Sequence, residues 1–397
     1  MPVLSITAAT VTSSLGAGLS AHEAALLAGR SGLQPAASTP GYTHAPGWLG
    51  AVESLDAIQL PAGSAAFDCR NNRLAWHGLN QDGFADRVGD AVRRYGAGRV
   101  GVFLGTSTSG IAQTEQAYQA AAASDFDALP GWYDYRHTHN VHSVSAFVAS
   151  ALGVDGFSQT ISTACSSSAK VFAAAARAIR AGVCDAAVVG GVDTLCETTL
   201  FGFHALQLVS PRACRPADAM RDGISIGEAA GFALLERPEI AAPWQLLGYG
   251  ESSDAHHMST PDPDGAGARL AMQQALQQAE LDAGSVDYVN LHGTGTPAND
   301  RAEARAVEAL LGREVPCSST KGWTGHCLGA AGILEAVVGL LAIRAGYVPQ
   351  SLNTESVDPD IGITIPLTGQ ARPVRHVLSN SFGFGGSNCS LLLGGGA

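Results

Sequence analysis

The sequence predicts an α/β fold in which helices and sheets alternate in layers and the second half of the chain repeats the first. Continuous apolar runs at 185–190 and 389–393 are typical of strands in sheets that are covered on both faces. An alanine-rich run at 171–180 predicts a helix that packs closely on such sheets. The pentapeptide Ala-Ile-Arg-Ala-Gly occurs at 178–182 and again at 342–346, each time at the end of a helix-prone run. The repeat indicates two related βαβ halves.

The chain is long enough to build two such halves around large apolar cores. It has 397 residues, of which 46% are hydrophobic and 15% charged, and its 48 glycines suit tightly packed helices and sheets. The polar, proline-containing stretch at 237–243 predicts the boundary between the halves. We therefore expect an N-terminal half at 1–243 and a C-terminal half at 244–397.

Charge and cysteine usage limit the class of protein. The net charge of −12 and the isoelectric point near 5.4 argue against nucleic-acid binding, which needs a basic face. The eight cysteines occur singly, without a CxxC pair, which predicts neither a zinc ribbon nor a disulfide framework. The sequence has no recognisable targeting signal and no apolar run that we judge long enough to cross a bilayer. We expect a cytoplasmic protein without a membrane span.

Cys165 lies among small residues at 162–169, directly before the helix-prone run at 171–180. Unpaired N–H groups and the positive end of the helix dipole favour thiolate over thiol at such a position, which makes Cys165 a candidate nucleophile. The small neighbours leave room for an acyl group. Cysteine is also among the most often buried residues, so the alternative is that Cys165 belongs only to the core.

Two histidines lie in glycine-flanked motifs of the C-terminal half. His292 follows the strand-like run at 286–290, and His326 precedes a second helix rich in small residues. Glycine permits close approach of the backbone, and loops at the ends of strands and helices often carry functional residues. A lone histidine is usually a satisfied structural residue, but two in such motifs indicate a site that includes Cys165.

We expect no metal site elsewhere in the chain. The histidines at 137, 139 and 142 are accompanied by neither a cysteine pair nor an acidic ligand, so we interpret them as part of a polar loop. The adjacent pair His256 and His257 has the same interpretation.

Several motifs in one order resemble the β-ketoacyl-acyl-carrier-protein synthases of the type I/II, Cys-His-His class. The resemblance covers nearly the whole chain. Its motifs are the opening turn at 11–16, the stretch around Cys165, 221–231, 261–265, the two histidine motifs and 380–388. The resemblance implies a thiolase-like fold of five layers, α-β-α-β-α, built from two duplicated βαβ halves.

The resemblance also implies a role for each residue of the site. Those implied to be catalytic are Cys165, His292, His326 and Lys321. Those implied to support them are Glu335, as the partner of Lys321, with Asp300 and Glu303. Without the resemblance, Lys321 and Glu335 would be read as a surface ion pair, and Asp300 and Glu303 as the start of a solvated helix.

Further positions are implied to contact the substrate. The backbone N–H groups of Cys165 and Phe384 would form the oxyanion hole. Thr294 and Thr296 would grip the pantetheine arm of the substrate carrier. The residues implied to line the acyl pocket are Ile111, Thr199, Phe203 and Phe384.

These residue types suit carbon–carbon bond formation between two thioesters. A cysteine can hold one acyl chain, and two neutral histidines can donate hydrogen bonds to the enolate that forms when a malonyl group loses carbon dioxide. We expect no bound cofactor or metal, because the phosphopantetheine arm arrives on the acyl carrier protein. The product would be a 3-oxoacyl chain in fatty-acid, polyene or polyketide elongation.

Three functions other than condensation are possible for a chain with this resemblance. A non-catalytic chain-length factor shares the fold but lacks the nucleophile, so Cys165 argues against it. A thiolase would have a different residue in place of the second histidine. A cysteine acyl hydrolase would need water to be positioned at the acyl-enzyme, and no motif does so.

The expected partners are an acyl carrier protein and a second subunit. The resemblance implies a dimer, formed with the same chain or with a chain-length-factor homologue. The glycine- and hydroxyl-rich loop at 105–111 lacks the lysine of a phosphate loop and is our candidate for the segment that crosses between subunits. The arginines at 70 and 73 are candidates for the contact with an acidic carrier.

Overall fold

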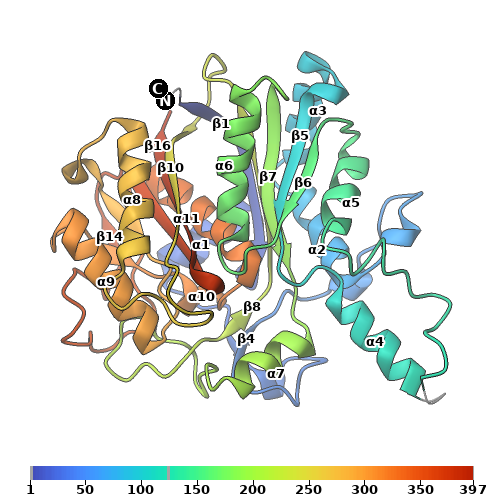
Figure 1. Ribbon diagram of the computed structural model, residues 1–397, viewed down its shortest axis with the longest axis horizontal. Helices are drawn as coiled ribbons and strands as arrows, with labels where there is room; N and C mark the ends of the chain where they lie inside the picture. The colour runs from blue at the N-terminus through green and yellow to red at the C-terminus, as the bar shows by residue number, and fades with distance from the viewer. Residues whose placement is uncertain (1–2, 123–125, 397) are drawn as a thin grey trace.

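The computed structural model describes residues 3–122 and 126–396 and has five alternating layers (Figure 1). Two five-stranded sheets enclose a middle layer of two helices, and further helices cover the outer face of each sheet. The predicted α-β-α-β-α order is confirmed.

The two sheets have the same topology. The first has the order β6 (Ser158–Ile161), β5 (Val100–Gly105), β7 (Ala186–Asp193), β9 (Ala229–Glu236) and β1 (Leu4–Ser13). The second has the order β12 (Cys317–Ser318), β11 (Tyr288–Asn290), β15 (His376–Gly383), β16 (Ser387–Gly395) and β10 (Trp244–Ser253). In each sheet the first three strands are parallel and the last two pairings are antiparallel. The strand order thus confirms the duplication that the repeated pentapeptide predicts.

The two sheets are joined at one edge. Strands β1 and β10 pair antiparallel from Leu4 opposite Leu246 to Ile6 opposite Trp244. The short strand β2 (Gly16–Ala17) pairs with the other end of β1. The join brings the faces of both sheets onto the same pair of middle helices.

The middle layer consists of α6 (Ser167–Arg180) and α11 (Ala331–Ala345), which pack against each other. Helix α11 is buried on nearly every side, as expected for an apolar helix without a polar face, whereas α6 is buried except along the side that carries Arg177 and Arg180. Glycines allow their close approach: a Cβ atom on Gly332 would lie 2.6 Å from the Ala169 nitrogen, and one on Gly105 would lie 2.4 Å from the Ser168 nitrogen.

One helical run corrects an expectation from the sequence. The run Leu328–Ala345 is long and apolar enough to cross a membrane, so the expectation that no run reaches that length is wrong. Of this run, 83% is buried inside the protein, so its apolar character is accounted for by its place in the middle layer.

The outer layers hold separate apolar cores. The helices on the first sheet are α2 (Arg70–Leu79), α3 (Phe84–Tyr95) and α5 (Ser143–Leu152), and those on the second are α8 (Ala266–Ala279) and α9 (Pro297–Leu311). The remaining helices are α1 (Leu19–Ala28), α4 (Ile111–Ala122), α7 (Glu197–Ala205) and the single turn α10 (Lys321–Thr324). The remaining strands are β3 (Gln34–Pro35), β4 (Trp48–Gly50), β8 (Ile226–Gly227), β13 (Tyr347–Val348) and β14 (Gln370–Ala371). Helix α4 stands away from the layered body (Figure 1).

We predict that Gly332→Ala destabilises the protein by about 1–3 kcal/mol, because the added methyl group has to push the two middle helices apart. Gly89→Ala in the exposed part of α3 is the matched control, since the nearest atom to its Cβ is the end of the flexible Arg93 side chain. The control should be neutral or stabilising by up to about 1 kcal/mol, the difference in helix propensity. Denaturant unfolding of both variants measures the effect, and equal stability of the two would contradict the predicted close contact.

Candidate active site

Cys165, His292 and His326 meet at the starts of the two middle helices. Cys165 lies just before α6, and His326 lies in the turn that leads to α11. The Cys165 Sγ and the His326 Nε2 are 2.9 Å apart, and the two imidazole rings pack edge to face with centroids 5.4 Å apart. The structure therefore brings together the three residues that the sequence singled out.

Both helix starts use the same strained turn. Ala164 has φ of 53° and Leu328 has φ of 51°, and each lies two positions before the N-cap of its helix. Left-handed backbone at a residue other than glycine costs about 1–3 kcal/mol and is often found at functional sites. The offset between the pentapeptides, from 178 to 342, is also the offset from 164 to 328. The turn that presents Cys165 is thus a feature of both halves.

Cys165 is a buried thiol at neutral pH. Burial raises its pKa to about 11, against the opposing effects of the Lys321 ammonium and of the Phe384 backbone N–H, which reaches the sulfur. The helix-start argument predicted a thiolate, and burial outweighs it. The thiol proton has an acceptor at hydrogen-bond distance in His326 Nε2, so deprotonation can accompany attack.

Both histidines are neutral. Burial lowers the pKa of His292 and of His326 well below the ordinary value, and the nearby Lys321 ammonium lowers both further. Lys321 Nζ lies 3.4 Å from His292 Nδ1, so Nδ1 is the acceptor and the His292 proton is on Nε2. A neutral imidazole with its N–H toward the reacting atoms is the donor that an enolate requires.

Lys321 forms a buried ion pair with Glu335. Both side chains are 1% exposed, and Nζ donates hydrogen bonds to Glu335 Oε1 and to the His292 carbonyl. A surface ion pair, the alternative considered from the sequence, is therefore wrong. The pair holds a cation next to both histidines without contact with solvent.

Glu303 holds the His292 loop from the opposite side. Its carboxylate accepts the N–H groups of His292 and Gly293 at 2.8 Å each and the Asn380 amide at 3.1 Å. Burial raises its pKa to about 7, and these donors oppose the rise. Glu303 and Asp300 are 2% and 5% exposed, which excludes the reading of this segment as a solvated helix start.

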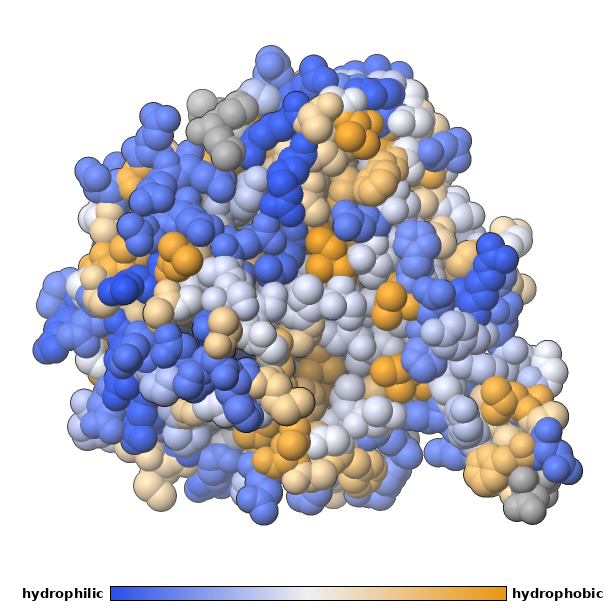
Figure 2. Space-filling model, in the orientation of Figure 1, coloured by the Kyte–Doolittle hydropathy of each residue, from blue (hydrophilic) through white to orange (hydrophobic). Residues whose placement is uncertain are grey.

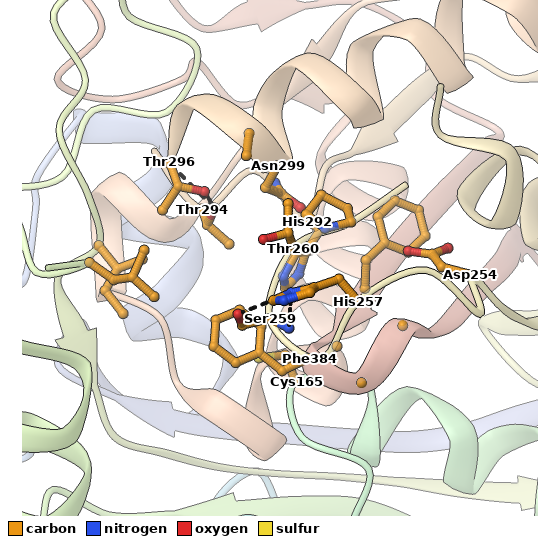
Figure 3. A pocket seen from close by; sticks show the side chains of 18 of the residues that line it. Cys165, Asp254, His257, Ser259, Thr260, His292, Thr294, Thr296, Asn299 and Phe384 are labelled. Atoms are coloured by element: carbon orange, nitrogen blue, oxygen red, sulfur yellow. Dashed lines mark hydrogen bonds between the residues drawn. The ribbon is translucent and has the colours of Figure 1, made fainter. Parts of the chain in front are cut away.

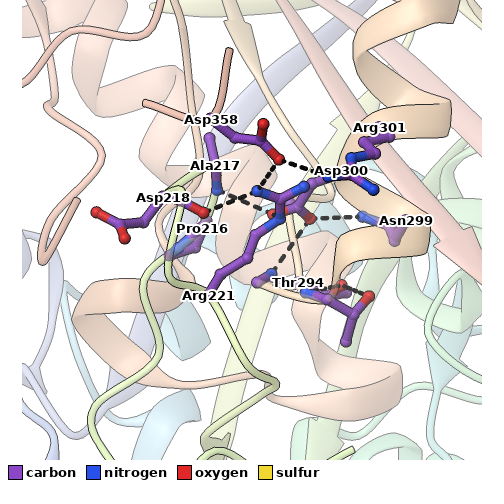
Figure 4. Close-up of polar contacts among 12 residues, drawn as sticks. Pro216, Ala217, Asp218, Arg221, Thr294, Asn299, Asp300, Arg301 and Asp358 are labelled. Carbon is purple, nitrogen blue, oxygen red and sulfur yellow. Dashed lines mark hydrogen bonds and ion pairs between the residues drawn. The ribbon is translucent and has the colours of Figure 1, made fainter. Parts of the chain in front are cut away.

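Arg221 connects the loop that carries Thr294 and Thr296 to two other segments (Figure 4). Its buried guanidinium lies 3.3 Å from Asp300 and 2.7 Å from Asp358. Asp300 in turn accepts the N–H groups of Ala217 at 2.9 Å and of Gly295 at 3.2 Å. The sequence showed Arg221 only as part of a motif and gave it no role.

The loop that Arg221 and Asp300 hold carries two adjacent hydroxyl groups. The hydroxyls of Thr294 and Thr296 are 2.8 Å apart, and both residues line the cavity described below. Their position agrees with the expected contact to a pantetheine arm.

A cavity of about 320 Å³ leads to Cys165 (Figure 3). It is lined by the two catalytic histidines, by Thr294 and Thr296, and by the phenyl rings of Phe203 and Phe384, whose centroids are 5.9 Å apart. Ile111 and Thr199 are not among the residues that line it. Ile111 begins α4, and the Thr199 hydroxyl donates to the Cys196 carbonyl in the first turn of α7. Their assignment to an acyl pocket stays a prediction.

Sequence reasoning missed one wall of the cavity. Its residues are Asp254, His257, Ser259, Thr260 and Asn299 (Figure 3). His257, which we interpreted as part of a polar loop, accepts the Ser259 N–H on Nδ1 at 3.2 Å. The neighbouring 261–265 motif was the available signal, because it belongs to the same loop.

The geometry also allows a metal ion at the site. The ligand atoms of Cys165, His292 and His326 all lie within 4.8 Å of one another. The other histidine cluster is a hydrogen-bonded polar loop: His137 contacts Asp134, His139 contacts Thr114, and His142 contacts Thr160.

Comparisons with protein families match most of the chain. Residues 71–241 match the model for "Beta-ketoacyl synthase, N-terminal domain", and residues 245–355 match the one for "Beta-ketoacyl synthase, C-terminal domain". Over 98% of this chain and 97% of the relative, the sequence is 33% identical to 3-oxoacyl-[acyl-carrier-protein] synthase 2 of Coxiella burnetii.

Solved structures give the same relationship. A ketosynthase from Xenorhabdus doucetiae, solved in complex with its chain length factor, superposes with a TM-score of 0.89 and 36% identity over 99% of this chain and 98% of that one. The ishigamide ketosynthase/chain length factor superposes with a TM-score of 0.88 and 28% identity over 99% of each chain.

We predict that alkylation of Cys165 by iodoacetamide is slow at pH 7 and rises about tenfold per pH unit up to pH 9, because only the thiolate reacts and its pKa is raised. Peptide mass spectrometry after timed labelling measures the rate at this cysteine separately from the other seven. Cys165→Ala serves as the control for the assignment. A rate that is already constant between pH 7 and pH 9 would show a resident thiolate instead.

Proposed function

Because the chain belongs to the β-ketoacyl synthase family, we propose that Cys165 carries the acyl chain to be extended and that His292 and His326 act on the malonyl unit. The protein is a 3-oxoacyl-[acyl-carrier-protein] synthase, an acyltransferase of fatty-acid or polyketide elongation. The observation that carries the proposed division of labour is the contact of Cys165 Sγ with His326 Nε2 at 2.9 Å beside a second neutral imidazole.

In the first step the acyl chain moves from a carrier thioester to Cys165. The sulfur attacks the thioester carbonyl as its proton passes to His326, and the carrier leaves as a thiolate that takes up that proton. The tetrahedral oxyanion is stabilised by the backbone N–H groups of Cys165 and Phe384. Support comes from the Phe384 N–H, which already reaches the Cys165 sulfur.

In the second step a malonyl thioester loses carbon dioxide. The electron pair of the breaking carbon–carbon bond moves to the adjacent carbon and is delocalised onto the thioester oxygen as an enolate. His292 and His326 donate hydrogen bonds to that oxygen, His326 as the neutral tautomer that carries its proton on Nε2 once Cys165 is acylated, and this stabilises the charge without a metal ion. Their low pKa values support this role, because they are neutral at working pH and lose no proton to the enolate.

In the third step the enolate carbon attacks the acyl-Cys165 carbonyl. The new carbon–carbon bond forms, the carbon–sulfur bond breaks, and the cysteine leaves as a thiolate that takes up a proton from solvent. The product is a 3-oxoacyl thioester two carbons longer. Thr294 and Thr296 hold the pantetheine arm during these steps through the hydroxyl pair that lines the cavity.

The carrier protein docks beside the cavity mouth. Arg70 and Arg73, the candidates from the sequence, are ion-paired with Glu228 and Asp68. We assign the docking surface instead to Arg269 and Arg305, which are exposed on α8 and α9 next to the 261–265 loop. Two positive groups at the entrance would attract an acidic carrier.

The second subunit, the same chain or a chain-length-factor homologue, covers α4 and the described residues 126–135. The loop at 105–111, our sequence candidate for the crossing segment, is largely buried within the subunit. Exposed apolar side chains gather instead on the projecting part of the molecule (Figure 2), where Tyr118, Trp132 and Tyr135 are each more than half exposed. Such a patch is typical of a protein interface.

We also propose a cytoplasmic location. All eight cysteines are buried as free thiols, including the catalytic one, and a reducing compartment preserves that state.

We predict that Cys165→Ala abolishes both self-acylation and condensation, whereas Cys165→Gln still releases carbon dioxide from a malonyl thioester. The Gln amide stands in for the acylated cysteine and leaves the histidines in place. In the Cys165→Gln background, His292→Ala and His326→Ala should each slow decarboxylation by about 10²- to 10³-fold, the usual loss for one oxyanion donor.

Intact-protein mass spectrometry measures acylation, and release of labelled carbon dioxide measures decarboxylation. His292→Ala should acylate at a rate closer to wild type than its decarboxylation rate, because of the two histidines it is His326 that lies at hydrogen-bond distance from the Cys165 sulfur. Equal losses in both half-reactions would contradict the proposed division of labour. Persistence of an acyl mass in Cys165→Ala would contradict Cys165 as the acyl carrier.

We predict that the protein sediments as a dimer at micromolar concentration, or reaches full activity only when produced with a homologous subunit. Replacement of Trp132 and Tyr135 by Ser should weaken the association, because both side chains are exposed on the projecting segment. Met220→Ser, at a side chain that is 67% exposed elsewhere on the surface, is the control. A stable and fully active monomer would rule out the proposed dimer.

A further inference from the structure

A buried carboxylate that the reaction steps do not use lies between the two catalytic motifs. Asp193, at the end of β7, is 0% exposed. It accepts the hydroxyls of Thr106 and Thr108 at 2.7 Å each, and the N–H groups of Ser107 at 2.8 Å, Thr108 at 2.7 Å and Ala330 at 3.1 Å. All of these groups donate to the carboxylate, which is therefore held in one orientation.

These donors come from two segments that lead to catalytic residues. Ser107 lies in the loop after β5, and its hydroxyl donates at 3.3 Å to the carbonyl of Ala164, the residue before Cys165. Ala330 is the N-cap of α11, and the turn that precedes it contains His326. Asp193 therefore connects the turn of the nucleophile with the turn of the histidine.

The turn that contains Gly329 packs tightly against Asp193 and Ser107. A Cβ atom on Gly329 would lie 2.7 Å from both the Asp193 Oδ2 and the Ser107 hydroxyl oxygen. A real Cβ atom essentially never comes this close to another heavy atom, so the turn packs directly against the carboxylate. A shift of the carboxylate has to move the turn with it.

The two duplicated halves differ in what lies at the start of their middle helix. At the start of α6 the Phe384 N–H, just beyond the end of β15, reaches the Cys165 sulfur. At the start of α11 the equivalent strand β7 ends in Asp193, which accepts the Ala330 N–H. A carboxylate at the positive end of a helix is favourable. Here it accepts an N–H group at the start of α11, the helix start that carries no nucleophile.

We propose that Asp193 is a positioning residue that fixes the 326–330 turn, and through it His326, against the reacting thioester. The inference rests on the proposed function, because it requires His326 to act in decarboxylation. An asparagine at 193 would turn an N–H₂ group toward donors that need an acceptor, so the turn would lose its support while the side chain keeps its size.

The test uses the full-length Cys165→Gln enzyme and release of labelled carbon dioxide from a malonyl thioester. Asp193→Asn should slow release by about 10- to 100-fold, a partial loss of one oxyanion donor. In a Cys165→Gln/His326→Ala background the same substitution should add less than about twofold, because residues that act through one group are not additive. A further loss of tenfold or more in that background, or an unchanged rate in the parent, would overturn the inference.

Controls separate positioning from general destabilisation. Asp82→Asn removes a carboxylate from a different helix start, where Asp82 accepts the Leu19 N–H at 3.0 Å, and it should leave the rate unchanged. With Cys165 intact, Asp193→Asn should change alkylation of that thiol at pH 9 by less than about threefold. Parallel losses in alkylation and decarboxylation would mean a structural role only, and would also overturn the inference.

A milder substitution keeps the test decisive if Asp193→Asn does not fold. Thr108→Val removes one hydroxyl donor from the same carboxylate, and Thr108→Ser retains it. Thr108→Val should slow decarboxylation several-fold, while Thr108→Ser should match the parent; equal rates for the two would count against Asp193. If the Cys165→Gln parent releases no carbon dioxide, the proposed function fails first, and the inference fails with it.

Discussion

The contact between α6 and α11 is the constraint on which the active site depends. Each helix begins with a turn that carries a catalytic residue, and both helices lie in one layer between two sheets. Helix α11 is apolar on nearly every side, so no polar face sets its orientation, whereas the basic side chains of α6 pair with Glu251 on β10. Close packing sets the positions of the two helices: Gly332 of α11 lies against Ala169 of α6, and Gly105 at the end of β5 lies against Ser168 of α6. The 2.9 Å distance from Cys165 to His326 is a consequence of that packing.

Burial in this layer sets the chemistry of the site as well as its geometry. The same low-polarity surroundings raise the pKa of the Cys165 thiol and lower that of both histidines, so every member of the triad is uncharged at rest. The positive charge belongs to Lys321, which is paired with Glu335. Uncharged donors next to a fixed ion pair stabilise a negative charge that appears only during reaction, because little has to reorganise at that moment.

The sequence predicted most of the fold and the three central residues, for identifiable reasons. Continuous apolar strands, small residues before helices and the repeated pentapeptide are local patterns, and the structure retains all of them. The ionisation of Cys165 could not be predicted, since the local helix start favours thiolate and only the tertiary burial decides against it. Asp193, Arg221 and the cavity wall at His257 were missed because their partners lie far away in the chain. The sheet that places Asp193 beside Ala330 leaves no mark on the sequence around either residue.

The duplication explains why the site is asymmetric although its scaffold is not. Ala164 and Leu328 occupy equivalent strained turns, each directly before one of the two middle helices. Two nucleophiles facing each other there would compete for one substrate. One turn holds Cys165, and the other holds Gly329 with the Asp193 carboxylate against the helix start, while its histidine turns toward the sulfur. Because the Ala330 N–H at the second helix start is already bonded to an internal anion, that group does not serve the charge that develops on a thioester. The repeated fold thereby provides one acyl site and one wall of hydrogen-bond donors from a single structural unit.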